Sequence, residues 1–405
     1  MRILVISPYY PPLNYARSLQ IGKVVKAMNL CQIEPVVITG DFLKLESETV
    51  ESIKVYRIPH WIRPQKKHIM GRLTSKIMQE LYSCNPFSQF VRLAEKKSTE
   101  LIQNKKIDCI FSSSTPFESH LVGLALSRKS DMPWIASFSD PWPGSINPSP
   151  YKEKVPFISA IQEYYLHKVL KRCSAVHLTN KYAIDLIENR TGLPIKDKSF
   201  VIPHIGSERD SKKLTDEYQG WLVHTGNLTR HRVSLPLLSA IKKVNTAIPN
   251  LFKGLICVGN VCPEFKSLVN KLGLEKCVRM LGHLPQEEAI EIAENAEALL
   301  VIEADMKFSP YLPSKFADYI VTGKAVIALT PPVSPIRDYL KKSCRGIAIS
   351  HDEDLIAAEL ERFWGSMIRG TACSEKDLLE QSLQNEFQPL SVGNRYKKML
   401  SNILY

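Results

Sequence analysis

The sequence contains neither a long apolar run nor a cysteine framework. No stretch approaches the ~18 consecutive apolar residues of a transmembrane helix, so we expect no membrane-spanning segment. The first residues, MRILVIS, enter a strand-like pattern directly and lack the apolar core and cleavage site of a signal peptide. The nine cysteines form no CxxC pair, and Cys257 and Cys262 have no histidine cluster nearby. We therefore predict reduced thiols in a cytoplasmic protein, and no metal ligands among them.

Positive charge is in excess, and nearly all of the excess lies in the first half of the chain. The formal net charge is +12. Residues 1–206 hold 28 Lys and Arg against 17 Asp and Glu, whereas the remainder holds 25 against 24. This asymmetry predicts an anionic partner for the first half. Nucleic acid, a membrane surface and a phosphorylated acceptor are the candidates.

Short apolar runs alternate with helical patterns along both halves of the chain, as is typical of doubly wound parallel sheets. We predict an α/β protein in which two Rossmann-like domains face each other across a cleft. The N-terminal domain covers 1–206 and the C-terminal domain covers 207–375. A last helical segment, 376–405, is expected to cross back to the first domain. Ligands of such sheets bind beyond the carboxyl ends of the strands.

The segment 61–106 is rich in basic residues and interrupts the alternation of apolar runs and helical patterns. Several apolar residues recur at helical spacing, with basic residues between them: Ile69, Met70, Leu73, Ile77 and Leu81. Such a helix can lie on an anionic bilayer. Its apolar stripe can equally pack on its own domain, and the sequence leaves both interpretations open.

A helix start, a lysine and a carboxylate occur together near residue 315. Pro313 fits the first helical position, and Ser314 with the adjoining N–H groups forms an anion site at a positive helix end. Lys315 adds a cation that the helix dipole disfavours unless an anion binds there. Asp318 follows one turn later on the same face. The set suits a nucleoside diphosphate with its ribose; a capped αβ unit with a solvated lysine and aspartate is the alternative.

Three residues of the first half are candidates for acceptor or sugar contacts. Asp140 follows a predicted strand, and His120 lies in a predicted helix; we expect both to face the cleft. The alternatives are an aspartate that caps the next turn and a histidine on a helix face. Arg17 is a candidate for an acceptor phosphate, or else a solvent-facing arginine.

Six short motifs occur in an order that points to one enzyme family. They are YYPPLNYAR at 9–17, STPFESHLVGLAL at 114–126, FSDPW at 138–142, HTGNLTRHR at 224–232, GHLP at 282–285 and LPSKFADYIVTGKAVIA at 312–328. The whole chain resembles the retaining glycosyltransferases of family 4, which have the GT-B fold. It is most similar to bacterial enzymes that build surface polysaccharides, such as O-antigen or capsule, on lipid carriers.

The resemblance implies a donor site in the second half. Gly226 begins the tight turn after the first strand of that domain, and Arg232 grips the donor diphosphate. Asn227 stands where many members have arginine, so one phosphate contact is missing or comes from Arg230. In the turn of Gly282, His283 and Leu284 the backbone meets the nucleobase edge. Ser314 and Lys315 take phosphate, and Asp318 takes ribose.

Two departures from the family pattern concern the sugar and the acceptor. The usual carboxylate pair, Glu-x7-Glu, falls here on Pro310 and Asp318, and Glu303 and Asp305 are out of register. The contact to the transferred sugar is therefore unassigned. The loop after the first strand carries Asn14 and Tyr15 in place of the usual glycines, which implies an acceptor site of different shape beside Arg17.

The implied activity is a hexosyltransferase reaction from a nucleoside-diphosphate sugar to a lipid-linked glycan. We expect His120, Asp140, Arg232 and Lys315 to be catalytic. The charge of the leaving diphosphate is met by Arg232, Lys315 and the helix end. No DxD-like acidic pair stands in a convincing place, so no metal and no cofactor is expected.

The resemblance and the basic first half together predict a cytoplasmic protein on the inner face of the membrane. One rival is a GT-B-like sugar-nucleotide epimerase, which leaves the basic first half unexplained. The other is a nucleic-acid-binding protein that uses 61–106. Nucleic-acid binding is disfavoured, because the basic residues lie in the half without the nucleotide motif and the aromatic residues form no stacking platform.

Overall fold

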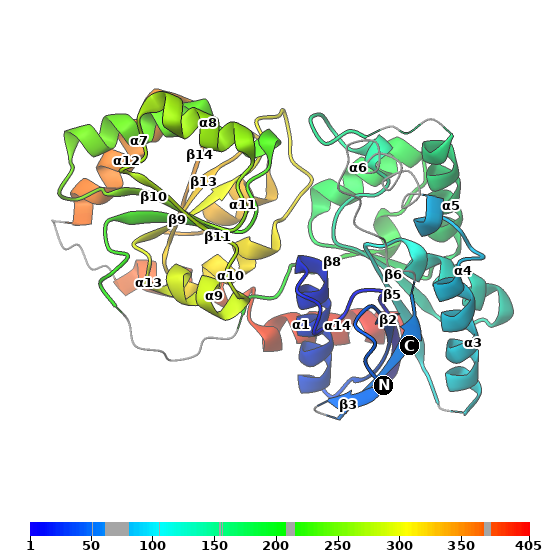
Figure 1. Ribbon diagram of the computed structural model, residues 1–405. Coiled ribbons are helices and arrows are strands. Elements are labelled where there is room, and N and C mark those ends of the chain that lie inside the picture. Colours follow the sequence, from blue (N-terminus) through cyan, green and yellow to red (C-terminus); the bar gives the residue numbers. More distant parts are fainter. Residues whose placement is uncertain are drawn as a thin grey trace. The chain divides into compact units, whose positions relative to one another are not determined.

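The structure is a computed structural model that describes residues 1–50, 52–60, 81–104, 106–153, 155, 157–207, 215–367 and 374–405. The chain divides into two compact units (Figure 1). Unit 1 consists of Met1–Ile205 and Pro389–Tyr405, and unit 2 of Gly206–Gln388. Each unit is built on its own sheet.

Unit 1 contains an eight-stranded sheet of order β3-β4-β2-β1-β5-β6-β7-β8. Its strands are β1 (Arg2–Ile6), β2 (Glu34–Asp41), β3 (Glu48–Val50), β4 (Ile53–Pro59), β5 (Cys109–Ser114), β6 (Trp134–Phe138), β7 (Ala175–Leu178) and β8 (Ser199–Val201). The strands pair in parallel, except that β3 runs antiparallel to β4 at the edge. Buried apolar runs such as β1 are what a parallel sheet covered on both faces requires.

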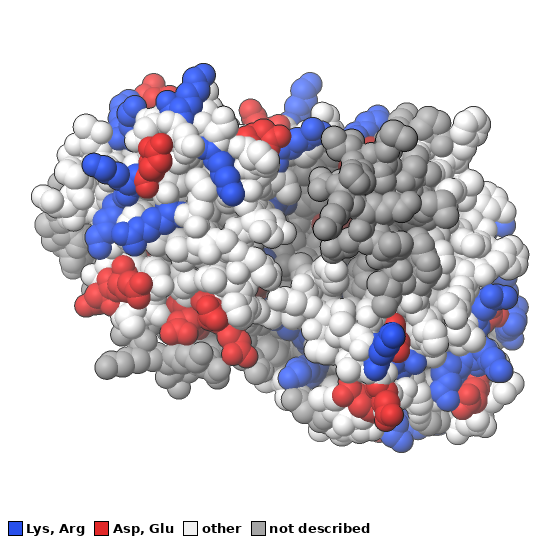
Figure 2. Space-filling model, viewed as in Figure 1, with Lys and Arg blue, Asp and Glu red and all other residues white. Residues whose placement is uncertain are grey.

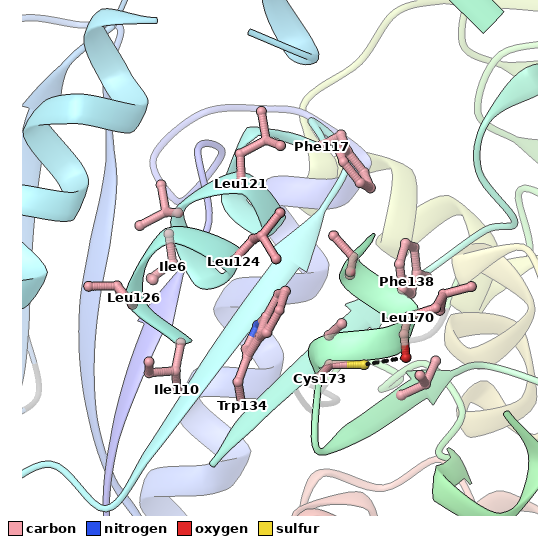
Figure 3. Close-up of a cluster of buried hydrophobic side chains, with 14 of the residues drawn as sticks. Ile6, Ile110, Phe117, Leu121, Leu124, Leu126, Trp134, Phe138, Leu170 and Cys173 are labelled. Atoms are coloured by element: carbon pink, nitrogen blue, oxygen red, sulfur yellow. Dashed lines mark hydrogen bonds between the residues drawn. The ribbon is translucent and has the colours of Figure 1, made fainter. Parts of the chain in front are cut away.

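Helices cover both faces of the unit 1 sheet. They are α1 (Ala16–Leu30), α3 (Gln89–Asn104), α4 (Glu118–Lys129), α5 (Ile158–Arg172), α6 (Lys181–Thr191) and α14 (Pro389–Leu404), with short 3-10 turns η1 (Gly144–Ile146) and η2 (Lys196–Lys198). Successive residues of β1 point to opposite faces. Ile3 and Val5 pack with α1 and α14, while Leu4 and Ile6 pack with α3, α4 and α5. Part of this second cluster is drawn in Figure 3.

Unit 2 contains a six-stranded sheet, parallel throughout, of order β11-β10-β9-β12-β13-β14. The strands are β9 (Trp221–Thr225), β10 (Gly254–Val258), β11 (Val278–Gly282), β12 (Ala298–Ile302), β13 (Ala325–Leu329) and β14 (Ile347–Ile349). The strand order reverses between β9 and β12. In open parallel sheets the carboxyl edge at such a reversal is where ligands bind.

Two groups of helices enclose the unit 2 sheet. On one face lie α7 (Leu235–Ala247), α8 (Pro263–Leu272) and α12 (Glu353–Met367). On the other lie α9 (Gln286–Asn295), α10 (Ser314–Thr322), α11 (Pro335–Leu340) and α13 (Ser374–Asn385). A short 3-10 turn, η3 (Arg230–Arg232), follows β9. Two parallel-sheet units confirm the predicted α/β class.

The C-terminal segment differs from the single helical segment expected over 376–405. It forms two helices: α13 belongs to unit 2 and α14 to unit 1. The break precedes Pro389, which is the first residue of α14, because a residue before proline disfavours helical geometry. In unit 1 α14 packs closely on α1: a Cβ added to Gly393 would lie 2.5 Å from Ala27 O.

The basic segment 61–106 is described only in part. Residues 61–80, which include Ile69 to Ile77 of the predicted amphipathic stripe, lie outside the described residues. The apolar side of α3 is buried in the core of unit 1, through Phe90, Val91 and Leu101. None of the described helices is long and apolar enough to span a membrane. Figure 2 shows basic and acidic side chains interspersed on the visible face of each unit.

Candidate functional site

Glycine turns close the carboxyl ends of three neighbouring strands in unit 2. Gly226 follows β9 with φ +92°, and Gly259 follows β10 with φ +123°. Gly259 N donates to Gly282 O at 2.6 Å, and a Cβ on Gly259 would lie 2.7 Å from Gly226 O. The turns pack backbone on backbone, which only glycine allows at these φ values and distances. These turns, which we call the floor, adjoin the start of α10, because a Cβ on Gly226 would meet the side chain of Lys315.

The side chain of Lys315 reaches this floor from the first turn of α10. Its Nζ donates to Thr225 O and lies 3.1 Å from His224 Nε2. A Cβ on Gly226 would be 3.0 Å from Nζ. Burial, and then the charge of Arg232, lower the pKa of Lys315 to about 7. A lysine held under these conditions is a strong candidate for an anion-binding group, because a bound anion restores its charge.

α10 begins one residue later than the sequence predicts. Pro313 is the N-cap rather than the first helical residue, and it supplies no side-chain cap. The N–H groups of the first turn, including that of Ser314, therefore lack a side-chain acceptor at the cap. A helix N-terminus without such a cap, next to Lys315, favours an anionic ligand.

The arginines predicted for the donor diphosphate lie in η3. Arg232 is half-buried, and its charge acts on Lys315, His224 and Glu303, so it belongs to the same cluster. Arg230 is exposed. Asn227, which stands at the family's arginine position, accepts from Asn260 N at 3.2 Å and joins the β9 and β10 loops. The structure therefore gives Asn227 a loop-bracing contact.

Asp318 has a contact that the sequence did not predict. Its Oδ1 accepts from the backbone N and from Oγ of Ser207, both at 2.9 Å. The carboxylate thus ties α10 to the first residues of unit 2. The nearby turn after β11 carries His283, which is exposed, and Leu284, which packs against the core.

Glu303 is a functional candidate that the sequence left unassigned. It follows β12, is 4% exposed, and accepts hydrogen bonds from Ser309 Oγ and Ser334 Oγ. Ser334 is also the N-cap of α11. Burial raises the pKa of Glu303 to about 7, against the lowering effect of the two serines. Glu303 fastens the loop before α10 to the start of α11, at the same sheet edge as Lys315.

In unit 1 the structure buries His120. The side chain is 0% exposed, its Nδ1 lies 2.7 Å from Ser112 Oγ, and its ring lies 4.4 Å from that of Phe138. Burial, and then the charge of Arg17, lower the pKa of His120 to about 3. The expectation that His120 faces an open cleft therefore needs correction. Almost every residue of α4 is buried, so this histidine joins the core.

Other predicted residues of unit 1 lie at the carboxyl edge of its sheet. Asp140 is exposed and is the second residue after β6. Arg17, in the first turn of α1, donates to Ser113 Oγ at the end of β5. Burial lowers the pKa of Arg17 to about 10, and the charges of Tyr396 and Asp140 oppose that shift. Arg17 also lines a small cavity together with Ser137, His177 and Tyr396.

The loop before α1 is exposed and aromatic. Asn14 is exposed, and Tyr15, the N-cap of α1, is 60% exposed. The ring of Tyr15 stacks on Tyr9 with centroids 5.5 Å apart, and Tyr9 lies 5.4 Å from Phe42. The rings follow β1 and β2. Their exposed end suits contact with a sugar ring or an apolar group.

Solved structures share this fold over 94–99% of their own length. Sucrose-phosphate synthase from Thermosynechococcus elongatus aligns with TM-score 0.67 at 13% identity, over 99% of this chain and 98% of that chain. The trehalose-6-phosphate protein from E. coli bound with UDP-2-fluoro glucose aligns with TM-score 0.62 at 10% identity, over 100% and 99%. A putative UDP-N-acetylglucosamine 2-epimerase from Listeria monocytogenes aligns with TM-score 0.59 at 11% identity, over 98% and 94%.

At these identities the likeness concerns the fold, which is the GT-B fold of glycosyltransferases. Neither a protein-family model nor a curated protein sequence matches the chain.

Proposed function

We propose that this protein is a retaining glycosyltransferase that uses a nucleoside-diphosphate sugar. The observation that carries the proposal is that Lys315 Nζ lies against the Gly226 turn. Lys315 stands in the first turn of α10, which has no side-chain cap, and the charge of Arg232 acts on it. Lys315 and a helix N-terminus thus meet at the Gly226 turn. This arrangement suits a diphosphate, whose oxygens need several donors at once.

The other donor contacts follow from the same edge of unit 2. Ser314 N and its neighbours take phosphate oxygens. Asp318 takes the ribose hydroxyls, and Gly226 lets the diphosphate approach the backbone. The turn at His283 and Leu284 meets the base. In support, the E. coli structure of the same fold holds UDP-2-fluoro glucose.

The proposed chemistry depends on stabilising the leaving group. As the sugar–phosphate bond breaks, negative charge grows on the diphosphate, and Arg232, Lys315 and the N–H groups of α10 are placed to stabilise it. In a front-face reaction the hydroxyl attacks the anomeric carbon from the side on which the phosphate leaves, so the anomeric configuration is retained, and the departing phosphate oxygen accepts the hydroxyl proton. No second carboxylate is then needed, in contrast to hydrolases. We propose no metal and no cofactor for this step.

We assign acceptor binding to the carboxyl edge of unit 1. Arg17 supplies a positive charge, Asp140 an exposed carboxylate, and Asn14 and Tyr15 an exposed polar and aromatic surface. His120 supports this edge from the core, because it holds α4 on β5 through Ser112. These groups suit a glycan linked to a lipid through phosphate, as in the assembly of bacterial surface polysaccharides such as O-antigen or capsule.

We further propose that the protein works at the cytoplasmic face of the membrane. The excess of 28 Lys and Arg over 17 Asp and Glu in residues 1–206 supports this. The purified protein should float with anionic liposomes at low salt and not with neutral ones. Equal flotation with both would contradict the proposal.

The proposed donor site is tested by thermal unfolding with a panel of nucleoside diphosphates. A ligand that binds only the folded state raises the midpoint. We expect a shift with one base, lost in Arg232→Ala and kept in Arg362→Ala, because Arg362 is an exposed arginine on α12 with no proposed contact to the donor. A parent protein that responds to none of the diphosphates would overturn the donor site.

The rival function is a sugar-nucleotide epimerase, since a putative enzyme of that kind shares the fold. The two differ in their need for an acceptor. An epimerase converts its sugar nucleotide when no acceptor is present, whereas the proposed transferase releases only slow hydrolysis products. Incubation of UDP-N-acetylglucosamine with the protein alone, followed by NMR of the sugar nucleotide, distinguishes them.

A further inference from the structure

His224 is a polar residue inside the buried strand β9. It is 1% exposed, and its Nδ1 lies 2.9 Å from Leu300 O in the adjacent strand β12. A carbonyl oxygen only accepts, so Nδ1 carries the proton and Nε2 of the neutral ring is an acceptor. That acceptor lies 3.1 Å from Lys315 Nζ. The fold therefore fixes the tautomer that can receive a hydrogen bond from the lysine.

The surroundings keep this ring neutral. Burial, and then the charges of Lys315 and Arg232, hold the pKa of His224 well below its ordinary value, although the bond to Leu300 opposes this. A protonated ring would lose the acceptor and repel the lysine. At physiological pH the His224 ring is thus neutral, and its Nε2 is available to accept a hydrogen bond.

Lys315 has one more donor than its protein partners use. An ammonium carries three N–H groups, and His224 Nε2 and Thr225 O accept two of them. Thr225 is itself held, because its N–H donates to Tyr319 OH at 2.7 Å. The third N–H is left for a ligand at Gly226, whose added Cβ would lie 3.0 Å from Nζ.

We propose that His224 is a positioning residue of the donor site: it holds Lys315 at the Gly226 turn, and binding of the donor diphosphate draws a proton from solvent onto Lys315. The inference rests on the proposed donor site and adds to it a residue and a coupled proton. The nitrogen gains one proton, and no other bond is made or broken.

The charges around Lys315 support proton uptake. Because burial, and then the charge of Arg232, lower the pKa of Lys315 to about 7, Lys315 without an anion beside it is part ammonium and part amine near neutral pH. A diphosphate beside Nζ favours the ammonium. Cys257, from β10, has a pKa raised to about 12, and the pKa of Tyr319 on α10 is raised further, so both stay uncharged. Asp318 is the acidic residue on α10 itself.

Burial raises the pKa of Glu303 to about 7, in the same range as that of Lys315, and the charge of Arg232 lowers it in part. Its share of any proton uptake must be measured separately. The variant Glu303→Gln removes its titration while keeping a side chain of the same size between Ser309 and Ser334.

Proton uptake is measured by calorimetric titration of the intact protein with UDP and GDP in buffers of different ionisation enthalpy. The reference is Lys315→Arg, which keeps a cation that does not titrate. We expect the parent and Glu303→Gln to take up more protons per bound diphosphate than Lys315→Arg does. This difference should be near zero at pH 6 and should approach one proton by pH 8.5. An equal uptake by all three proteins at every pH would overturn the inference.

Two substitutions separate the roles of the ring nitrogens. His224→Asn keeps a donor for Leu300 O and loses the acceptor for Lys315, whereas His224→Gln can keep the acceptor and loses the donor. We expect the His224→Gln protein to bind the diphosphate about tenfold more tightly than the His224→Asn protein, because a hydrogen bond to a charged group has this order of strength. A purely structural role predicts the reverse order.

The outcomes also separate the inference from the function on which it rests. A parent protein that binds neither UDP nor GDP contradicts the donor site. A parent that binds one of them without excess proton uptake contradicts only the coupling. If both His224 variants fail to fold, the uptake measured on the parent and on Lys315→Arg still decides.

Discussion

Lys315 Nζ lies 3.1 Å from His224 Nε2, across 91 positions of the chain. The two residues come from the start of α10 and the end of β9, and they meet because parallel strands bring their carboxyl ends to one edge. Tyr319, one turn after Lys315, holds the neighbouring Thr225 through its hydroxyl. The first turn of α10 is thus fastened to the floor on which we place the donor diphosphate.

The Gly226 turn should tolerate no side chain. In Gly226→Ala the new Cβ would stand 3.0 Å from Lys315 Nζ, where we place a phosphate oxygen. Gly273→Ala is the matched control, because Gly273 also has a positive φ (+67°) but open space around its Cβ. Both variants should lose roughly 1–2 kcal/mol of stability from backbone strain. Only Gly226→Ala should lose nucleoside diphosphate binding by calorimetry; equal binding by both would contradict the placement.

Glu303 should make the stability of unit 2 depend on pH. Its folded pKa of about 7 lies above the ordinary glutamate value of 4.5, so the folded state favours the protonated acid. The stabilisation is complete below pH 4.5 and is lost as the pH rises through 7, a change of roughly 3 kcal/mol. Chemical denaturation between pH 5 and 8 should show this loss in the parent and not in Glu303→Gln. Glu359→Gln, at a partly exposed position of α12, should behave like the parent.

Asp140 should matter for turnover and little for folding. It is exposed at the carboxyl end of β6, where the acceptor is proposed to bind. Asp140→Asn should lower the transfer rate on the order of tenfold or more, because misplacing a reactant has effects of this size. Asp131→Asn changes an exposed aspartate before the same strand and should leave the rate unchanged. Equal rates for all three proteins would remove Asp140 from the site.

Chelation should leave the reaction unaffected. Arg232, Lys315 and the start of α10 supply the positive charge that a metal ion provides in other transferases. We expect the same rate of donor turnover in excess EDTA as with added Mg²⁺ or Mn²⁺. A rate that falls in EDTA and returns with either metal would contradict this part of the mechanism.

The sequence indicates those parts of the proposed site that depend on strand order and on where helices begin. Lys315 and Asp318 could be proposed from the sequence because a helix start followed by a buried strand is a local pattern; the structure has this helix and strand, and the roles of the two residues stay predictions. His224 and Glu303 were missed as partners because their roles arise only when β9, β12 and β13 align. Both interrupt or end an apolar strand, in WLVHT and LLVIE, and that interruption was the available signal. His120 was misplaced because α4 is buried on nearly all sides and its spacing marks no single face.

The central claim is that Lys315 at the Gly226 turn binds the diphosphate of a sugar nucleotide. Its most direct test is a calorimetric titration of the parent, Lys315→Met and Lys324→Met with the nucleoside diphosphate that stabilises the parent. Lys324 lies just beyond the other end of the same helix and serves as the control. We predict that the parent and Lys324→Met bind alike and that Lys315→Met binds at least about tenfold more weakly, as expected on losing a charge-assisted hydrogen bond. Equal affinity of all three proteins would contradict the account.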